Sequence, residues 1–315
     1  MEILLHIGYL LLGIALLYWG GEFLVTGSSR IAESFGVRKI IIGLTLVAFG
    51  TSAPELVVSG LASLGGYGEM ALGNIVGSNI ANIGLVLGLT AMIVPLTIEP
   101  KVLRWEVPLM ILASAVFFGM CQDGELDRVD GIILLVLFVM FIYTCMINAK
   151  ETGGTVILRR LRPKQKLSLA GLSLLGLVML GGGGKLLVDG GVFFAKSFGI
   201  PEFIIGLTML AIGTSLPELV VSLIAAFRKS SDLSVGNVVG SNIFNIMLVL
   251  GVVAIIRPLP VGPEEQFFHL PVMLGFAFLT FPLMRRGLRL SRFDGTIIFS
   301  CFVLYYVLLF TVFKP

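Results

Sequence analysis

Two copies of one short motif place a carboxylate inside a long apolar run of this chain. GTSAPE at 50–55 ends in Glu55, and GTSLPE at 213–218 ends in Glu218. An ionisable side chain at the centre of a bilayer costs about 3 kcal/mol even on lenient insertion scales, so it is expected to serve a function. Because the two glutamates lie in matched settings, the sequence predicts that they act together.

Oxygen-bearing groups precede each glutamate. Pro54 has no amide hydrogen and its ring clashes with the carbonyl of Gly50, so we expect the helix to kink or open there. Carbonyl oxygens freed by an open helix must line a cavity or bind a ligand, because lipid offers them no hydrogen bond. The oxygen-bearing residues of the two copies are Ala48, Gly50, Thr51, Ser52 and Glu55, and Ala211, Gly213, Thr214, Ser215 and Glu218. Carboxylates, carbonyls and hydroxyls without imidazole or thiolate suit hard cations such as Ca²⁺ or Na⁺.

A second duplicated motif, GNIVGSNIAN with its copy GNVVGSNIFN, carries amide side chains in an apolar setting. Asn74, Ser78 and Asn82 recur at a spacing of four and share one face of a helix, which we expect to look toward the glutamates. Alternatively, the small residues only let helices pack closely, and the asparagines only join those helices. This alternative is favoured for Asn79 and Asn242, which lie off that face.

The composition predicts an all-α integral membrane protein. Hydrophobic residues make up 57% of the 315 residues and charged residues only 13%, with a mean hydropathy of +1.02. Soluble domains average about 25% charged residues, and stretches of about 17 to 25 apolar residues can each cross a bilayer as a helix. Ten transmembrane helices are predicted, at 3–26, 40–64, 70–94, 105–121, 129–149, 167–188, 202–227, 233–256, 267–284 and 294–312.

The two halves of the chain are copies of each other. A shift of 163 positions aligns them without a gap from about residue 8 to residue 90, and within 41–59 the second copy is identical at 15 of 19 positions. Each half holds five predicted spans, an odd number, so the second copy begins on the opposite face and the repeats are inverted. Inverted repeats are typical of secondary transporters, whose sites lie near the midplane between the copies. The predicted division is a first five-helix repeat at 1–150, a linker at 151–166 and a second, inverted five-helix repeat at 167–315.

Basic residues gather in alternate loops. Of the 22 lysines and arginines, 17 fall in loops that the predicted topology puts on one side of the membrane, six of them from Lys150 to Lys166. The opposite loops carry Asp123, Glu125, Asp127, Asp130, Glu264 and Glu265. The positive-inside rule therefore places the basic linker in the cytoplasm and both termini outside, in a multi-pass protein of the cell membrane. The basic run is short and lacks interleaved aromatic residues, so nucleic-acid binding is not expected.

Other chemistry is poorly represented in the chain. Cys121, Cys145 and Cys301 lie far apart without metal-ligand or CxxC spacing, and we interpret them as packing residues. His6 and His269 lie at the edges of predicted spans, outside the duplicated motifs, so neither is expected to bind a metal. Buried carboxylates could serve as acid and base, yet no nucleophile paired with a base appears. We expect no enzymatic activity, no prosthetic group and no obligate protein partner beyond transported ions and the bilayer.

The motifs with their flanking residues resemble a known family. GTSAPELVVS with GNIVGSNIANIGLVLG, and GTSLPELVVS with GNVVGSNIFNIMLVLG, resemble the two alpha-repeats of the sodium/calcium exchanger family over nearly the whole chain. The length is similar to that of the compact prokaryotic members, because the connector is far too short for a large regulatory insert. The resemblance implies exchange of about three Na⁺ for one Ca²⁺, with spans one and six sliding as a gating pair across a fixed core.

The resemblance also implies ligands for a diamond of four cation sites. Glu55 and Glu218 would be shared ligands of Ca²⁺ and Na⁺ at its centre. The further ligands would be Thr51, Thr214 and the carbonyls of Ala48 and Ala211, with Ser52, Ser78, Ser215 and Ser241 at flanking Na⁺ sites and Asn82 and Asn245 at the remaining corners. Potassium-dependent exchangers carry Asp at the position of Asn245, whereas potassium-independent animal exchangers resemble this chain in carrying Asn.

The expected function is secondary active, electrogenic antiport of Na⁺ against Ca²⁺ by alternating access, in which the same glutamates cannot satisfy both cargoes at once. A Ca²⁺/H⁺ antiporter is an alternative, because a buried carboxylate can carry a proton. A K⁺-dependent Na⁺/Ca²⁺ antiporter is another. A passive cation channel is a further alternative, because broken helices with oxygen ligands suit a selectivity filter.

Overall fold

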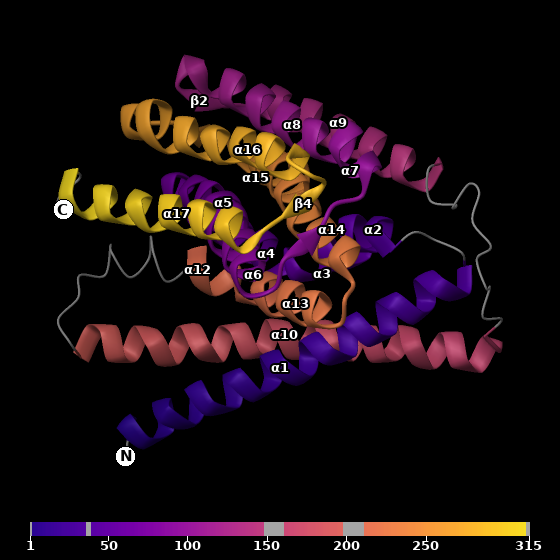
Figure 1. Ribbon diagram of the computed structural model, residues 1–315. Helices are drawn as coiled ribbons and strands as arrows, with labels where there is room; N and C mark the ends of the chain where they lie inside the picture. Colours follow the sequence, from indigo (N-terminus) through magenta and orange to yellow (C-terminus); the bar gives the residue numbers. More distant parts are fainter. Residues whose placement is uncertain (1, 36–38, 148–160, 198–210, 313–315) are drawn as a thin grey trace.

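The first half of the chain is a series of helices joined by short turns (Figure 1). The computed structural model describes residues 2–35, 39–147, 161–197 and 211–312. The helices of the first half are α1 (Glu2–Phe35), α2 (Lys39–Ile42), α3 (Ala48–Thr51), α4 (Ala53–Leu64), α5 (Gly68–Ala81), α6 (Gly88–Ile93), α7 (Pro100–Arg104), α8 (Glu106–Met120) and α9 (Arg128–Ile147). Two π-helical turns, η1 (Gly43–Val47) and η2 (Asn82–Leu87), continue these helices, and a 3₁₀ turn, η3 (Cys121–Asp123), follows α8.

The second half repeats this series. Its described helices are α10 (Pro163–Ser197), α12 (Ala211–Thr214), α13 (Leu216–Phe227), α14 (Ser231–Ile243), α15 (Leu250–Ile256), α16 (Leu270–Arg285) and α17 (Arg292–Val312). Its π-helical turns are η5 (Phe244–Val249) and η6 (Glu265–His269). The π-helical turn η5 in the second half corresponds to η2 in the first, so the sequence repeat is also a structural repeat.

The described helices account for most of the predicted spans. Eight of them are long and apolar enough to cross a bilayer, and the bent pair 40–51 and 53–64 makes a ninth if it is one span. These nine agree with nine of the ten predicted spans. The tenth, predicted at 202–227, begins outside the described residues, and α13 forms its described end.

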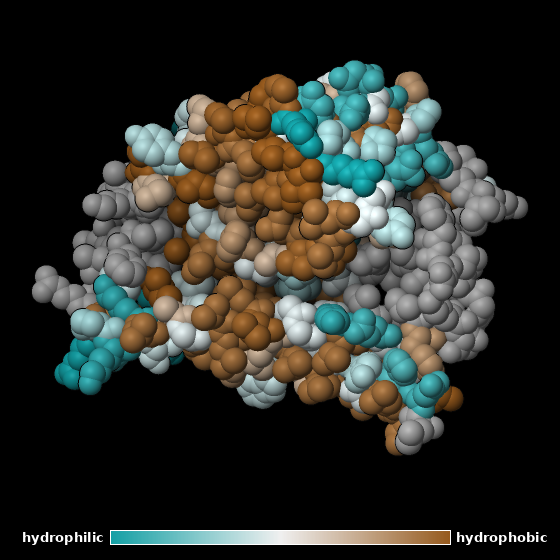
Figure 2. Space-filling model, turned by 180° about the vertical axis from the view of Figure 1, so that it is seen from behind, coloured by the Kyte–Doolittle hydropathy of each residue, from teal (hydrophilic) through white to brown (hydrophobic). Residues whose placement is uncertain are grey.

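The middle of each half lies at the centre of the molecule. In the spans 68–93 and 231–256, 78% of the most apolar window is buried by protein, against 17% in the span that α1 provides. The remaining spans therefore turn much of their apolar surface outward, as expected of helices in contact with lipid. Figure 2 shows hydrophobic side chains covering the middle of one face, with hydrophilic ones gathered at the upper right and lower left.

Two small antiparallel ladders, which the all-α prediction did not include, join the halves. β1 (Leu96–Thr97) pairs with β4 (Arg289–Leu290), and β2 (Glu125–Leu126) pairs with β3 (Leu259–Pro260). The chain leaves α6 and α15 in an extended conformation, so its amides need partners outside the helix. A loop of the other half supplies them in each case.

The long helices α1 and α10 cross each other at the lower side of the molecule (Figure 1). Glycines allow their backbones to touch: a Cβ on Gly176 would lie 2.7 Å from the carbonyl oxygen of Gly20, and one on Gly183 would lie 2.9 Å from that of Gly13. Small residues at such a crossing permit close helix packing in a membrane. The pair rests against the rest of the molecule mainly through α13 and α12.

Candidate cation site

Helices break at both GTS motifs. The first break separates 40–51 from 53–64 and bends the helix axis by 42°. Ser52 at this break has φ −85° and ψ 3°, and Ser215 at the second break has φ −84° and ψ 0°. The kink that the sequence predicted is therefore confirmed in the first half, and the second half has the same local backbone.

The prolines and glutamates begin new helices after these breaks. Pro54 and Pro217 lie in the first turn of α4 and α13, where a missing amide hydrogen leaves no helical bond unmade. Glu55 and Glu218 follow in the same turn. The backbone amides at a helix N-terminus favour negative charge, so the breaks help to stabilise both carboxylates.

All twelve predicted ligand residues are buried. No side chain among them is more than 6% exposed, and both glutamates are 0% exposed. The twelve are Ala48, Thr51, Ser52, Glu55, Ser78, Asn82, Ala211, Thr214, Ser215, Glu218, Ser241 and Asn245. Burial of so many polar groups is costly unless they find partners, so their contacts decide what the site does.

Hydrogen bonds across the two halves bring these residues together. Glu218 Oε1 accepts a bond from Ser52 Oγ of the first half at 3.2 Å and one from Ser241 Oγ at 3.3 Å. Thr51 Oγ1 lies 3.4 Å from Ser241 Oγ, and Glu55 lies in the first turn of α4, three residues after Ser52. We call this buried polar cluster around Glu218 and Glu55 the chamber; its hydroxyls come from both halves.

The opposite corner of the chamber repeats these contacts with the halves exchanged. Ser78 Oγ lies 3.3 Å from Thr214 Oγ1, which matches the contact between Thr51 and Ser241. Glycines permit this approach: a Cβ on Gly77 would lie 3.0 Å from the Cβ of Ala211, and one on Gly240 would lie 2.8 Å from that of Ala48. Each GNxVGSN helix thus packs on the broken helix of the other half.

Several buried atoms in the chamber have no hydrogen-bond partner among the described residues. They are Glu55 Oε1 and Oε2, Glu218 Oε2, Ser215 Oγ, and both amide atoms of Asn82 and of Asn245. An unpaired buried polar atom costs about 1–3 kcal/mol, and a charged one costs more. A bound cation would satisfy the oxygen atoms in this set.

Two other asparagines join neighbouring helices through their amide nitrogens. Asn74 Nδ2 donates to Ser59 Oγ at 3.0 Å, and Asn237 Nδ2 donates to Ser222 Oγ at the same distance. Asn237 Oδ1 also accepts a bond from Thr51 Oγ1 at 3.2 Å, which positions that ligand candidate. The Asn74 amide group therefore joins α4 to α5, the alternative that the sequence left open.

The asparagines off the helical stripe bond to their own helices. Asn79 Nδ2 donates to the carbonyl of Ile75, and Asn242 Nδ2 donates to that of Val238, both at 2.8 Å. The sequence favoured a role in joining helices for this pair, but these two bonds lie within α5 and within α14 and join no helices.

The carbonyls of the two predicted alanine ligands are not left open by the breaks. Ala48 O accepts the Ser52 amide at 2.9 Å and Ala211 O accepts the Ser215 amide at 3.3 Å. The threonine hydroxyl of each motif also lies within 3.4 Å of the same oxygen. The expectation that helix opening would free the Ala48 carbonyl was wrong, because the helix bends at Ser52 and the Ser52 amide still bonds to this carbonyl.

Two features of the chamber were not predicted. The π-helical turn η2 begins at Asn82, and η5 contains Asn245. Such turns insert an extra residue into a helix and often occur at functional sites. Sequence periodicity has no clear signal for them.

The donor set suits a hard cation. Within the part of the chain that the structure describes, no three His, Cys, Asp or Glu residues gather as a metal site. The chamber instead offers two carboxylates, hydroxyls and amide oxygens, which suit Ca²⁺ or Na⁺ better than zinc or copper. Many of the chamber's candidate ligands are neutral, so a cation bound there could also be released.

Comparison with known proteins gives the chamber its context. The profile of the sodium/calcium exchanger protein family matches residues 5–147 and 168–311, which include both duplicated motifs. The chain belongs to the sodium/calcium exchanger family. It is 39% identical to the putative antiporter CaxA of Alkalimonas amylolytica, covering 96% of this chain and 98% of that one.

Two further relatives are named for ion exchange. The chain is 32% identical to the sodium/calcium exchanger MaX1 of Methanosarcina acetivorans, over 96% of this chain and 98% of that one. Its structure resembles that of the sodium-calcium exchanger NCX_Mj soaked with 10 mM Na⁺ and zero Ca²⁺, with a TM-score of 0.86 and 33% identity over 97% of this chain and 99% of that one. The exchanger family thus accounts for the fold as well as the motifs.

Proposed function

We propose that this protein is a secondary active antiporter that exchanges Na⁺ for Ca²⁺ across the cell membrane by alternating access. Family membership supports a cation/Ca²⁺ antiporter. The single observation that carries the sodium-coupled proposal is the buried chamber, in which Glu55 and Glu218 lie among neutral hydroxyl and amide groups from both halves. Such a chamber can hold either one divalent ion or monovalent ones.

The proposed architecture is ten transmembrane helices in two inverted repeats, 1–150 and 167–315, joined by a cytoplasmic linker at 151–166. The exchanged contacts on the two sides of the chamber and the two equivalent ladders support this arrangement. An even number of spans puts both termini on one face, which we propose is the outside. The start of α1 and the end of α17 both lie at the left of Figure 1.

We propose that all twelve predicted residues line the ion path. The two glutamates bind both cargoes, whereas the hydroxyls, the asparagine oxygens and the alanine carbonyls complete the coordination. The two ions therefore compete: when Na⁺ occupies the glutamates, Ca²⁺ lacks the carboxylate ligands that it needs, and the reverse also holds. This competition couples the two gradients.

The crossed pair of α1 and α10 is the proposed moving part. Its glycine-lined crossing forms a compact unit of its own, and it meets the rest of the molecule mainly at the broken helices that carry the ligands. Sliding of the pair would open the chamber to one face and close it to the other, while the ligand helices stay in place.

The proposed stoichiometry is about three Na⁺ per Ca²⁺, so that one positive charge crosses in each cycle. Two carboxylates neutralise one Ca²⁺ but leave three Na⁺ with one charge in excess. A dependence of exchange on membrane voltage would test this stoichiometry directly.

The decisive experiment replaces each central carboxylate by its neutral isostere. Glu55→Gln and Glu218→Gln should each abolish Na⁺-driven uptake of radioactive Ca²⁺ into proteoliposomes, because half of the negative charge of the chamber is lost. Glu69→Gln, which makes the same change at an exposed position, should leave uptake intact. Undiminished uptake in either glutamate variant would refute the assignment of the site.

The same vesicles separate the alternatives. Ca²⁺ uptake driven by a pH difference without Na⁺ would favour a Ca²⁺/H⁺ antiporter, and a requirement for K⁺ would favour the potassium-dependent type. Flux that never runs against a Ca²⁺ gradient would favour a channel. We expect only a Na⁺ gradient to drive uphill Ca²⁺ movement.

A further inference from the structure

The turn between α16 and α17 concentrates positive charge outside the cation chamber. It carries Arg285, Arg286, Arg289 and Arg292 within eight positions. The acid in this turn, Asp294, is engaged by the backbone: its Oδ2 accepts bonds from the amide of Ser291 at 2.8 Å and from its hydroxyl at 2.6 Å. This cap closes the N-terminus of α17, so the arginines are not needed to hold the turn.

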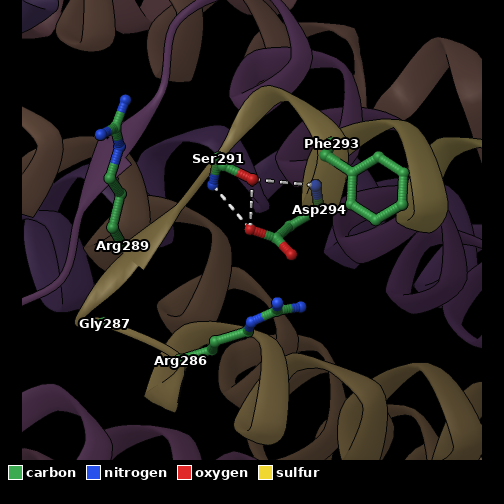
Figure 3. Close-up of a pocket in the computed structure, with 6 residues that line it drawn as sticks. All are labelled: Arg286, Gly287, Arg289, Ser291, Phe293 and Asp294. Carbon is green, nitrogen blue, oxygen red and sulfur yellow. Dashed lines mark hydrogen bonds between the residues drawn. The ribbon is translucent and has the colours of Figure 1, made fainter.

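The turn also encloses a pocket of about 340 Å³, which we call the arginine pocket. It is lined by Arg286, Gly287, Arg289, Ser291, Phe293 and Asp294. Figure 3 shows Arg286 extending beneath the Asp294 carboxylate, while Arg289 lies on the other side of the turn with its guanidinium directed away from that carboxylate. Phe293 lies at the far edge and is 68% exposed.

The neighbouring segment of the first half adds charge and an aromatic ring. β1 pairs with β4, and the amide of Ile98 donates to the carbonyl of Leu288 at 2.8 Å. The helix that follows, α7, presents exposed Lys101 and Arg104 and ends at Trp105, which is 73% exposed. Glu99 lies in the same segment, but basic side chains and exposed aromatic rings outnumber it in the α16–α17 turn and in α7.

The corresponding turn of the first half shows that the arginines are not required by the fold. Between α8 and α9, the amide of Asp127 donates to Asp130 Oδ2 at 3.1 Å, and β2 forms the equivalent ladder with β3. This turn nevertheless carries four acidic residues, Asp123, Glu125, Asp127 and Asp130. The same backbone design therefore has opposite charge in the two halves.

We propose that the arginine pocket binds the phosphate of an anionic phospholipid headgroup. Arg286 and Arg289 would turn their guanidinium groups onto the phosphate, which they suit by charge and geometry. Phe293 and Trp105 would lie at the boundary of the acyl chains, where aromatic rings are favoured. A soluble phosphate would make no use of these exposed rings, so the lipid is the better occupant.

Tryptophan fluorescence tests the proposal directly. The chain has two tryptophans, Trp19 and Trp105, so Trp19→Phe leaves one reporter, at the end of the helix that follows β1, the partner of β4. In phosphatidylcholine vesicles, a small fraction of brominated phosphatidylglycerol should quench Trp105 far more than the same fraction of brominated phosphatidylcholine. Arg286→Gln with Arg289→Gln should raise the fraction needed for half-maximal quenching about 25-fold, at roughly fivefold for each of the two basic residues lost.

A matched pair of substitutions controls for overall charge. Arg162→Gln with Lys164→Gln removes the same charge from exposed positions around the start of α10 and should change nothing. If the double arginine variant does not fold, Arg289→Gln alone should show a smaller shift in the same direction.

Three results would overturn the proposal. Equal quenching by both brominated lipids would show ordinary lipid contact, and an equal loss in the Arg162 and Lys164 variant would show a general charge effect. Relief of quenching by inorganic phosphate would show that the pocket takes a soluble anion instead. Anionic lipid is present in both leaflets and no ion flux is measured, so failure here would leave the proposed exchange and orientation untouched.

Discussion

At the scale of single residues, the charge of the cation chamber is its main property. Asn82 and Asn245 are buried without hydrogen-bond partners in the described chain and carry no charge. Only Glu55 and Glu218 supply negative charge among the proposed ligands. The affinity for a divalent ion should therefore respond strongly to one more carboxylate.

Asn245→Asp tests this response. The added charge, a few ångströms from the ion at low effective dielectric, should tighten Ca²⁺ binding about tenfold or more, which corresponds to about 1.4 kcal/mol. Equilibrium binding of radioactive Ca²⁺ without Na⁺ measures the effect. Gln122→Glu adds the same charge at an exposed turn and should leave affinity unchanged; an unchanged affinity in Asn245→Asp would remove this residue from the site.

The sequence predicted which residues are buried together, but not all of their roles. Duplication alone pointed to Glu55 and Glu218, and their shared chamber follows from packing of the two copies. The sequence could not distinguish Asn74, whose amide nitrogen bonds to Ser59, from Asn82, which has no hydrogen-bond partner among the described residues, because both lie on the same helical face. That difference depends on which neighbour each side chain meets.

At the scale of helices, close glycine contacts set the position of the ligand-bearing segments. The helix α14 lies against the backbone of α2 and η1: a Cβ on Gly236 would be 2.7 Å from the carbonyl oxygen of Ile40. A backbone atom cannot move aside as a flexible side chain can. The spacing of small residues predicted close packing, but their partners lie in the other half of the chain and could not be read from local sequence.

Gly236→Ala should lower the thermal stability of the detergent-solubilised protein, at a cost of about 1–3 kcal/mol for overpacking. Gly171→Ala is the matched control, because a Cβ there meets nothing within 4 Å. It should be neutral or stabilising by up to about 1 kcal/mol, since alanine favours a helix. Equal melting temperatures for the two variants would contradict the packing described for Gly236.

The ladders and the π-helical turns mark the limit of prediction from local pattern. β1 is two residues long and has no strand signal of its own; it exists because Arg289 and Leu290 of the other half lie beside it. The turn at Asn82 is likewise continuous in sequence with the helix that it modifies. Hydrophobic periodicity identified the spans, whereas these features arise only when the halves meet.

At the scale of the whole molecule, an ion pair between described residues links the crossed helices to the remainder. Arg228, which follows α13, pairs with Glu22 of α1 and also donates to Thr26. The arginine and glutamate side chains are 39% and 23% exposed, so the pair should contribute at most about 1 kcal/mol. Its importance is geometric, because motion of α1 against α13 would have to break it.

A charge exchange tests this link. Glu22→Gln and Arg228→Gln should each alter the rate of Ca²⁺ exchange, and the two together should act no more strongly than either alone. Glu22→Arg combined with Arg228→Glu rebuilds the pair in reverse and should restore the rate. Additive effects of the two single changes, or a reversed pair as impaired as they are, would show that the contact does not constrain the motion.

The two ladders also bear on how the protein is made. Leu96 finds its partner only when Leu290 has been synthesised, and the hydroxyl of Thr51 awaits Asn237 in the same way. The first five helices therefore enter the bilayer with buried polar groups still unmatched. Until the ribosome has synthesised nearly the entire chain, the first half lacks these hydrogen-bond partners, because the second half supplies them.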